Sequence, residues 1–505
     1  TADAKHGPSG SPDTSLARTA GRCDARGMER LSGSDAWYLS LETPSAPMVV
    51  TGVIGLDPST APDGFDPASL RTHMADRVPL IPAFRRRLAT VPLSADRPRW
   101  VDDPDFDLDH HLSLHRFDEP ASHDDLATYI GELMSRRLPR DRPLWEMTLL
   151  EGLTGGAAAV VLRMHHAIVD GISGVALMAD LFDLTPDSPR RTEDDPGWDP
   201  EAMPSATRLL GDGLGARIAE PLRPLQILSR TTRALADAGL ATAAQRRRGS
   251  TAAGQPMNAP RTPFNRSLTP ERSVAFTSRP FEEFRRLRHH FGVTINDVVM
   301  CATGIGLRNH LSDLGEAVDR PLVVSVPVSV HGAADDASSN QVSAMFVELP
   351  MGLDDPATML AAVSRSSTAS KEVNAAMGSD LIGDVAELIP GPVFSVGVDL
   401  YKRLGLADRL PPVHNLVISN VAGAPVPVFM AGAKVTGMWP FGPLLEGAGL
   451  NVTVFSADGE MMLGVVTCPE LIPDVRKVLD AIGQGLDALT AAADRGDQLP
   501  PTTES

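Results

Sequence analysis

The chain has 505 residues, which suggests two large domains, because a domain typically holds roughly 150 residues. Its hydrophobic share of 42% and charged share of 22% are close to globular averages and exclude wholesale disorder. The net charge of -18 argues against nucleic acid as a partner, since the phosphates would repel the chain as a whole.

Cysteine usage and apolar runs set the expected compartment. Cys23, Cys301 and Cys468 are far apart and in no paired spacing, so we expect neither a disulfide framework nor a structural zinc site. A reducing compartment, the cytoplasm, follows. The first thirty residues lack the apolar core of a signal peptide, and no run reaches the roughly 18 apolar residues of a spanning helix. Any membrane contact is therefore expected to be peripheral.

Helix and strand signals alternate through the first half of the chain. Residues 1–27 are polar and predict a disordered leader. Beyond them, capping residues and prolines mark helix ends, and apolar runs mark strands. In chain order we expect a helix from about residue 35 that ends before Pro44, a strand at 48–56, a helix from Asp66 to about 78, a helix at 124–138, paired strands at 145–150 and 157–164, and a helix at 172–184.

Residues 186–270 differ in composition from the segments on either side. An acidic, proline-rich stretch precedes weakly amphipathic helices that prolines interrupt, which predicts a crossover linker with helices. Within it, residues 204–250 hold eight arginines against three acidic residues, a basic island on an acidic protein. This Arg-rich island is compatible with an anionic lipid surface, although a solvated helical face is the simpler interpretation.

The second half alternates strands and helices again. We expect a strand at 273–277, a helix closed by Gly292, a helix that Thr294 caps, strands at 322–328, 342–349 and 415–421, a hairpin of 450–455 and 461–466 across Asp458-Gly459, and a helix from 473 to about 492. Mixed elements in both halves predict an α/β protein with domains at 28–185 and 271–495, followed by a disordered tail at 496–505.

The segment RMHHAIVDG at 163–171 is the most informative for chemistry. It places His165 and His166 at the end of a buried strand, just before a turn. Neighbouring side chains on a strand point to opposite faces, so only one of the two can face a given cleft. A neutral imidazole, with an ordinary pKa of about 6.5, is suited to act as a general base. Asp170 and Gly171 stand where the chain must turn, which favours an architectural role for both.

HHAIVDG resembles the HHxxxDG signature of the coenzyme-A-dependent acyltransferase superfamily, which includes chloramphenicol acetyltransferase and nonribosomal peptide condensation domains. Further landmarks, in the same order along the chain, resemble one branch, the bacterial wax ester synthase/diacylglycerol acyltransferases. The resemblance runs from about Met28 to Pro473. Its landmarks are Pro143-Leu144-Trp145-Glu146, Asn296-Asp297-Val298-Val299, Pro327-Val328-Ser329-Val330, Ser419-Asn420-Val421, Ala431-Gly432-Ala433 and Leu450-Asn451-Val452-Thr453-Val454.

This resemblance implies two chloramphenicol-acetyltransferase-like domains, each a mixed β-sheet flanked by helices, with a shared cleft between them. It implies transfer of a fatty acyl group from acyl-CoA to the hydroxyl of diacylglycerol or a long-chain alcohol, giving triacylglycerol or wax ester without a covalent intermediate. Acyl-CoA is then a substrate, and no cofactor or metal is expected. A peripheral position on the inner face of the membrane or on lipid droplets is compatible with such substrates.

The same resemblance assigns the site residues. His166 maps onto the general base, His165 onto its neighbour in the motif, and Asp170 onto an orienting or salt-bridging residue. Asn296 and Asp297 are placed at the active site, where the first turn of a helix favours a developing oxyanion. Pro143, Leu144, Trp145 and Gly171 complete the motifs as support.

Two departures from the family pattern affect local details. Val49 stands where the family usually has a histidine after Pro-Met, close to the expected mouth of the substrate channel. The second departure is a loop with the sequence Asn420-Val421-Ala422-Gly423-Ala424, which lacks two prolines that are common in the family. Their absence raises the entropy of the unfolded chain at this loop. Neither departure affects HHAIVDG.

Two other functions are compatible with the same motifs. One is a polyketide-associated or condensation-type acyltransferase that uses carrier-bound donors. The other is a non-catalytic lipid-binding protein of the same fold. A metal held by His166 and Asp170 would need both on one face of a helix, and the predicted strand argues against that.

Overall fold

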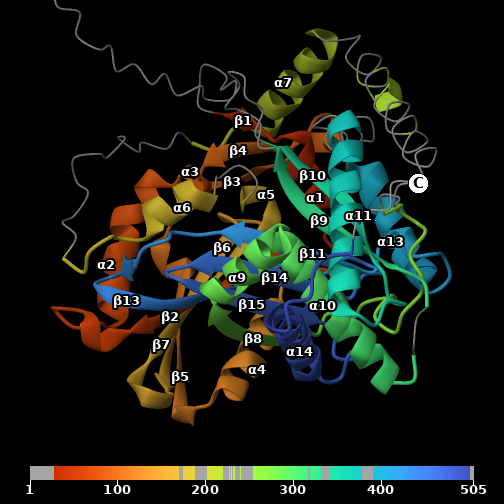
Figure 1. The fold of residues 1–505 in the computed structure, drawn as a ribbon. Coiled ribbons are helices and arrows are strands. Elements are labelled where there is room, and N and C mark those ends of the chain that lie inside the picture. The colour runs from red at the N-terminus through yellow and green to blue at the C-terminus, as the bar shows by residue number, and fades with distance from the viewer. Residues whose placement is uncertain are drawn as a thin grey trace, which may run out of the picture.

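The computed structural model describes residues 28–169, 174–187, 202–219, 254–316, 319–330, 341–377 and 391–500, with 227, 229, 231–233 and 239. These residues form two six-stranded mixed sheets and a three-stranded sheet, with helices on the sheet faces (Figure 1). The predicted α/β class, with two mixed sheets flanked by helices, is confirmed. The predicted leader and most of the Arg-rich island lie outside the described residues.

The first sheet has the strand order β12-β13-β2-β7-β6-β5. It is mixed because β5 and β6 are parallel, whereas its other pairs are antiparallel. The predicted hairpin is confirmed as β6 and β7, and every residue of β7 is buried, as expected for a central strand covered on both faces. The strands are β2 (Val49–Asp57), β5 (Leu112–Ala121), β6 (Trp145–Leu153), β7 (Ala158–His165), β12 (Phe429–Met430) and β13 (Ala433–Phe441).

Two of these strands come from the second half of the chain. In Figure 1 the blue strand β13 lies beside the orange β2, and Val435 pairs with Leu56 in an antiparallel ladder. Pro425 and Pro427 interrupt the apolar run before these strands, and the sequence predicted no strand there. The second half therefore completes the sheet that carries the histidine pair, while the predicted domain ranges stay a prediction.

The second sheet has the order β10-β9-β11-β14-β15-β8, and it is mixed because β11 is parallel to both of its neighbours. The predicted hairpin is confirmed, and its turn residues Asp458 and Gly459 have φ angles of 45° and 79°, as a tight hairpin turn requires. The strands are β8 (Ser273–Pro280), β9 (Leu322–Val330), β10 (Gln341–Leu349), β11 (Leu416–Ala422), β14 (Leu450–Ala457) and β15 (Glu460–Thr467). The third sheet joins β1 (Glu29–Arg30), β4 (Arg99–Asp102) and β3 (Arg86–Ala89).

Most helix boundaries follow the caps seen in the sequence. Asp66 caps α2 in a capping box, Thr294 and Asp297 do the same for α10, and Gly292 closes α9 with a φ of 67°. The longer helices are α1 (Gly33–Leu41), α2 (Pro67–Arg77), α4 (His123–Met134), α6 (Gly174–Leu181), α7 (Ala206–Ala219), α9 (Phe281–Phe291), α10 (Ile295–Asp313), α11 (Pro356–Met377), α13 (Gly391–Arg403) and α14 (Val475–Asp494).

Two helices end earlier than predicted. α4 stops at Met134 rather than at 138, where the hydroxyl of Ser135 donates to the carbonyl of Gly131 at 2.8 Å and accepts the N–H of Arg272 at 3.1 Å. α6 stops at Leu181 rather than at 184, because the backbone of Asp183 pairs with Phe429 of β12, with two N–H···O bonds of 2.8 Å. A tertiary contact with the second half of the chain thus ends α6.

Helices α10 and α14 pack closely because glycines lie at their contact. A Cβ atom added to Gly485 would lie 2.2 Å from the carbonyl oxygen of Ala302. Two residues earlier on α14, a Cβ atom added to Gly483 would meet nothing within 4 Å. The two glycines are therefore a matched pair on one helix.

We expect Gly485→Ala to lower the free energy of unfolding by about 2 kcal/mol, because the added methyl group overpacks a rigid backbone contact. Gly483→Ala should raise it by about 0.5–1 kcal/mol, because alanine is the better helix former. Urea unfolding of both variants tests this, and equal midpoints would show that the helices do not pack at Gly485.

Among the described residues, no single helix is both long and apolar enough to cross a membrane. Helices α9 and α10 together are long and apolar enough, but the pair is bent by 100° at its junction.

Candidate active site

The two histidines lie where a strand passes into a helix. β7 ends at His165, and the one-turn helix α5 (His166–Val169) begins at His166. Backbone hydrogen bonds hold the junction on both sides, since the N–H of His165 donates to Leu144 O at 2.9 Å and that of His166 to Met48 O at 2.7 Å. The junction is thereby fixed between β2 and the Pro143-Leu144-Trp145 segment.

The junction differs from the predicted one in one respect. The sequence placed both imidazoles on the strand, but the helix begins at His166, so strand alternation does not set the direction of that side chain. His165 is 1% exposed, whereas His166 is half-buried. Asp170 and Gly171 lie outside the described residues.

His166 has an apolar and aromatic environment. Its ring stacks on Tyr38 of α1 with centroids 3.9 Å apart and planes 21° from parallel. Burial lowers the pKa of His166 from 6.5 to about 4. Its buried Nδ1 atom has no hydrogen-bond partner. The imidazole is therefore neutral at pH 7.

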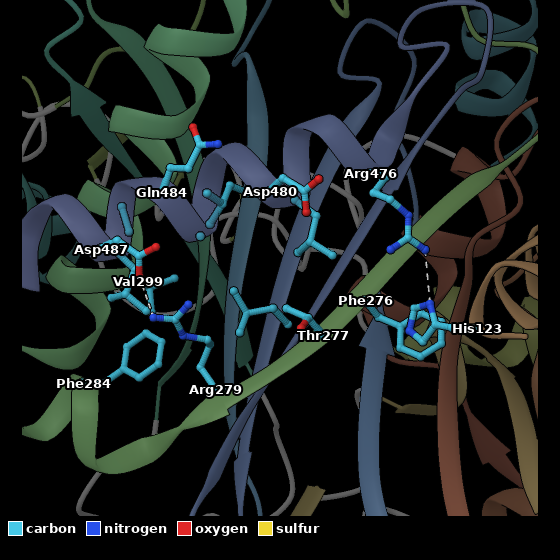
Figure 2. A pocket seen from close by; sticks show the side chains of 16 residues that line it. His123, Phe276, Thr277, Arg279, Phe284, Val299, Arg476, Asp480, Gln484 and Asp487 are labelled. Carbon is cyan, nitrogen blue, oxygen red and sulfur yellow. Dashed lines mark hydrogen bonds and ion pairs between the residues drawn. The ribbon is translucent and has the colours of Figure 1, made fainter. Parts of the chain in front are cut away.

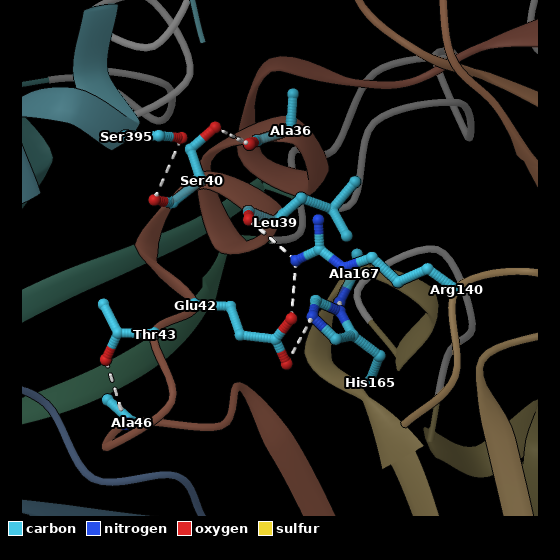
Figure 3. Close-up of polar contacts among 10 residues, drawn as sticks. All are labelled: Ala36, Leu39, Ser40, Glu42, Thr43, Ala46, Arg140, His165, Ala167 and Ser395. Carbon is cyan, nitrogen blue, oxygen red and sulfur yellow. Dashed lines mark hydrogen bonds and ion pairs between the residues drawn. The ribbon is translucent and has the colours of Figure 1, made fainter. Parts of the chain in front are cut away.

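His165 belongs to a buried polar network, shown in Figure 3. Its Nδ1 accepts the N–H of Ala167 at 3.1 Å, and its Nε2 lies 3.8 Å from Oε1 of Glu42, too far for a hydrogen bond. Arg140 donates to the other carboxylate oxygen of Glu42, Oε2, at 2.5 Å and to the carbonyl of Leu39 at 3.1 Å.

This network fixes the state of His165. Because Nδ1 accepts a backbone N–H, the proton of the neutral ring must sit on Nε2, facing the carboxylate of Glu42. Burial, then the nearby Arg140 and His166, lower the pKa of His165 to about 3, so the ring is neutral. His165 thus holds the backbone of Ala167, the residue that follows His166 in the one-turn helix α5.

The Pro143-Leu144-Trp145 segment also holds the junction in place. Trp145 is fully buried, donates its indole N–H to Phe84 O at 2.8 Å, and stacks on Phe84 and on His111. Its backbone N–H bonds the carbonyl of Pro143 at 2.9 Å. These contacts fix the start of β6, and with it the Leu144 carbonyl that receives His165.

Asn296 and Asp297 lie in the first turn of α10, beside the second sheet. Asp297 accepts the N–H of Thr294 at 3.0 Å and the hydroxyl of Ser364 at 3.2 Å, so one of its carboxylate oxygens is used for capping. Asn296 is half-buried, and its Oδ1 has no hydrogen-bond partner. Within the described part of the chain, no hydrogen bond is seen between this turn and His165 or His166.

Family models match both halves of this chain. The wax ester synthase/diacylglycerol acyltransferase catalytic domain matches residues 31–299, and the C-terminal domain of the same family matches residues 338–490. The chain belongs to the wax ester synthase/diacylglycerol acyltransferase family. It is accordingly an acyltransferase of that family, and the resemblance seen in the sequence is confirmed.

Relatives of this family member cover nearly all of it. A protein of Mycobacterium tuberculosis named provisionally as a diacylglycerol O-acyltransferase is 36% identical over 92% of this chain and 91% of its own length. A second such protein from the same organism is 31% identical over 92% of this chain and 98% of its own length.

Solved structures show the same fold. The wax ester synthase/diacylglycerol acyltransferase of Marinobacter aquaeolei aligns with a TM-score of 0.63 at 23% identity, over 92% of this chain and all of that one. The first condensation domain of the CDA synthetase aligns with a TM-score of 0.52 at 17% identity, over 93% of this chain and 97% of that one. The TRI3 trichothecene 15-O-acetyltransferase of Fusarium sporotrichioides gives 0.52 at 12% identity, over 92% and 95%.

Two residues beside the family's histidine motif were missed in the sequence. Tyr38 and Glu42 lie at the end of α1, more than 120 positions before His166, and both contact the histidine pair. The available signal was a lone carboxylate that follows the apolar segment Trp37-Tyr38-Leu39-Ser40-Leu41. That signal does not reveal that the carboxylate is buried, because burial here depends on how α1 packs.

A pocket of about 430 Å³ lies elsewhere on this family member, between β8 and α14 (Figure 2). Both of its arginines are already paired, since Arg279 bonds Glu283 and Asp487, and Arg476 bonds Asp124. Its lining includes His123 but neither His165 nor His166. This pocket is therefore separate from the histidine junction.

Proposed function

We propose that the protein transfers a fatty acyl group from acyl-CoA to the hydroxyl of a diacylglycerol or a long-chain alcohol, with His166 as general base and no covalent enzyme intermediate. The observation that supports this most is the state of His166, a neutral and half-buried imidazole within the family's motif. The proposed products are triacylglycerol and wax ester.

The geometry suggests which ring nitrogen acts. Nδ1 is buried and has no hydrogen-bond partner, so it is closed to an incoming hydroxyl, and we propose that the neutral ring keeps its proton there. Nε2 then carries the free lone pair. In the proposed step, Nε2 takes the hydroxyl proton while the oxygen attacks the thioester carbonyl. The tetrahedral intermediate then breaks its carbon–sulfur bond, and the imidazolium returns the proton to the departing thiolate.

The supporting residues have distinct proposed roles. Glu42 and Arg140 position His165, which holds the backbone N–H next to His166. Asn296, in the first turn of α10, is proposed to stabilise the oxyanion together with the positive end of that helix. Asp170 is proposed as an orienting residue on the basis of the family motif alone.

Substrates, partners and location are also proposals. Family membership supports acyl-CoA as donor, and the M. tuberculosis relatives carry a diacylglycerol acyltransferase name, which supports diacylglycerol as acceptor. A cytoplasmic location agrees with the buried free thiols of Cys301 and Cys468. Attachment to a lipid surface through residues 204–250 stays a proposal from the sequence.

The decisive assay supplies labelled palmitoyl-CoA with dioleoylglycerol and hexadecanol in parallel and resolves the products by thin-layer chromatography. We expect labelled ester that depends on the acceptor, with one CoA released per ester. Ester from carrier-bound donors but not from free acyl-CoA would support the condensation-type function instead. Stoichiometric lipid uptake without CoA release would support a lipid-binding protein.

The lowered pKa of His166 predicts the acid limb of the pH–rate profile. A general base must be neutral, so turnover should stay level from neutral pH to about pH 5 and fall as the pH approaches about 4. In the unfolded chain a histidine binds a proton near 6.5, so stability also declines between about 6.5 and 4. Circular dichroism must therefore show folded protein at each pH. An acid limb near 6.5 in folded protein contradicts the assignment.

A further inference from the structure

Helix α13 exposes an apolar stripe. Val393, Val396 and Leu400 follow each other at intervals of three and four residues, so they share one face of the helix. Leu404 comes directly after the last helical residue, and its N–H donates to the carbonyl of Leu400 at 3.0 Å. Leu410 and Val413, which follow the turn at Gly405, are exposed as well. The side chains of this α13 patch are between 42% and 66% exposed: Val393, Val396, Leu400, Leu404, Leu410 and Val413.

Other side chains of α13 anchor it on the helix that covers the histidine pair. Phe394 packs on Trp37 of α1 with ring centroids 4.0 Å apart, and Ser395 donates to the carbonyl of Ser40 at 3.5 Å, as Figure 3 shows. Tyr38, the neighbour of Trp37, stacks on His166. The α13 patch is therefore connected to the imidazole through a single helix, α1.

Basic side chains lie at the C-terminal end of the patch. Arg403 and Arg409 are exposed within it, and Lys402 is half-buried beside them. Arg261 donates to the carbonyl of Leu410 at 2.6 Å, so it holds the turn that carries the end of the patch. The nearby acids among the described residues are Asp399, Asp408 and Glu446, which lies near Tyr401. Asp408 is bonded by Ser267 and lies near Arg261 and Arg266. With these two arginines, five basic groups stand against three acids here, on a chain whose net charge is -18.

We propose that the α13 patch docks this protein on an anionic lipid surface, which deepens the proposed function because it brings a lipid-dissolved acceptor to the end of the molecule that carries His166. An amphipathic helix with aliphatic side chains on one face and cations beside them binds at the boundary between headgroups and acyl chains. The cations attract anionic headgroups, which the rest of this acidic chain repels.

A second copy of the chain fits the patch less well. A two-fold contact would place the same surface on both partners and bring Arg403 and Arg409 of each copy together. Like charges at such a contact oppose association, whereas anionic headgroups neutralise them. The proposed docking surface is also distinct from the Arg-rich island at 204–250.

The first test measures vesicle binding of the full chain without any catalysis. In a flotation assay, vesicles of phosphatidylcholine and phosphatidylglycerol should bind a larger fraction of the parent protein than vesicles of phosphatidylcholine alone. Val396→Asp/Leu400→Asp should weaken binding by about tenfold or more, because two apolar contacts are lost. Arg403→Gln/Arg409→Gln should reduce the preference for anionic vesicles by about fivefold for each arginine.

The matched control is Leu93→Asp/Leu114→Asp, which adds the same charge at two exposed leucines of the N-terminal half. It should bind vesicles as the parent does. The proposal is overturned if the parent binds neither vesicle, if the α13 variant binds as well as the parent, or if the α13 variant only abolishes self-association.

The second test separates docking from chemistry. The α13 variant should transfer acyl groups to monomeric hexanol at the parental rate but should be about tenfold slower on dioleoylglycerol held in vesicles. Equal loss on both acceptors would contradict docking. If the parent transfers no acyl group to either acceptor, the proposed function fails, while flotation still tests the patch.

Discussion

Replacing His166 with alanine is expected to lower acyl transfer by about a hundredfold or more, the scale on which a general base contributes. The variant loses the proton acceptor, so the hydroxyl must attack the thioester without one. Its fold should persist, because the junction is held by backbone bonds of His165 and His166 that do not involve the imidazole of His166. The measurement is labelled ester formation at saturating acyl-CoA, with circular dichroism of the same sample.

The control is His289→Ala, which removes an exposed histidine on α9, far along the chain from the motif. It should keep parental turnover. A folded His166→Ala enzyme with full activity would remove His166 from the mechanism and leave the neutral imidazole as a structural feature.

Arg140→Ala should have the largest effect on stability. It leaves the carboxylate of Glu42, whose side chain is 2% exposed, without its hydrogen-bond donor beside His165. Loss of one partner of a buried ion pair is strongly destabilising, and we expect about 2–3 kcal/mol because Arg140 itself is half-exposed. Turnover should fall as well, because the Glu42–His165 contact supports the turn that carries His166. Urea unfolding and ester formation measure both effects.

A second substitution distinguishes an unpaired charge from lost packing. Glu42→Gln in the Arg140→Ala background makes the buried group neutral, so the double variant should recover most of the lost stability. Arg142→Ala is the matched control, since Arg142 pairs with the exposed Asp141 and should change stability by less than about 0.5 kcal/mol. If the double variant is as unstable as Arg140→Ala, the Glu42 charge is not the cause.

Local signals in the sequence predicted much of the fold. The capping residues Asp66 and Thr294, the glycine after α9 and the Asp458-Gly459 turn all act over a few residues, and each is found where it was expected. The entry of β13 into the first sheet could not be predicted, because its register depends on pairing with β2 across more than 370 positions of chain. The same holds for α6, whose end is set by its contact with β12.

The candidate site was predictable where chemistry is contiguous in sequence. HHAIVDG identified the histidine pair directly, and the structure places it at a strand-to-helix junction. Glu42 and Tyr38 could not be found in this way, because only the packing of α1 brings them to the histidines. The roles of Asn296 and Asp297 stay predictions, since the structure shows a capped helix end and, among the described residues, no hydrogen bond from it to His166.

A single-turnover experiment tests direct transfer by His166 most directly. Enzyme in excess over labelled acyl-CoA is mixed with and without acceptor, and free CoA, labelled ester and labelled protein are followed over time. The account predicts that CoA and ester appear at the same rate, only with acceptor present, and that the protein stays unlabelled. Rapid CoA release without acceptor, accompanied by label bound covalently to the protein, would contradict it.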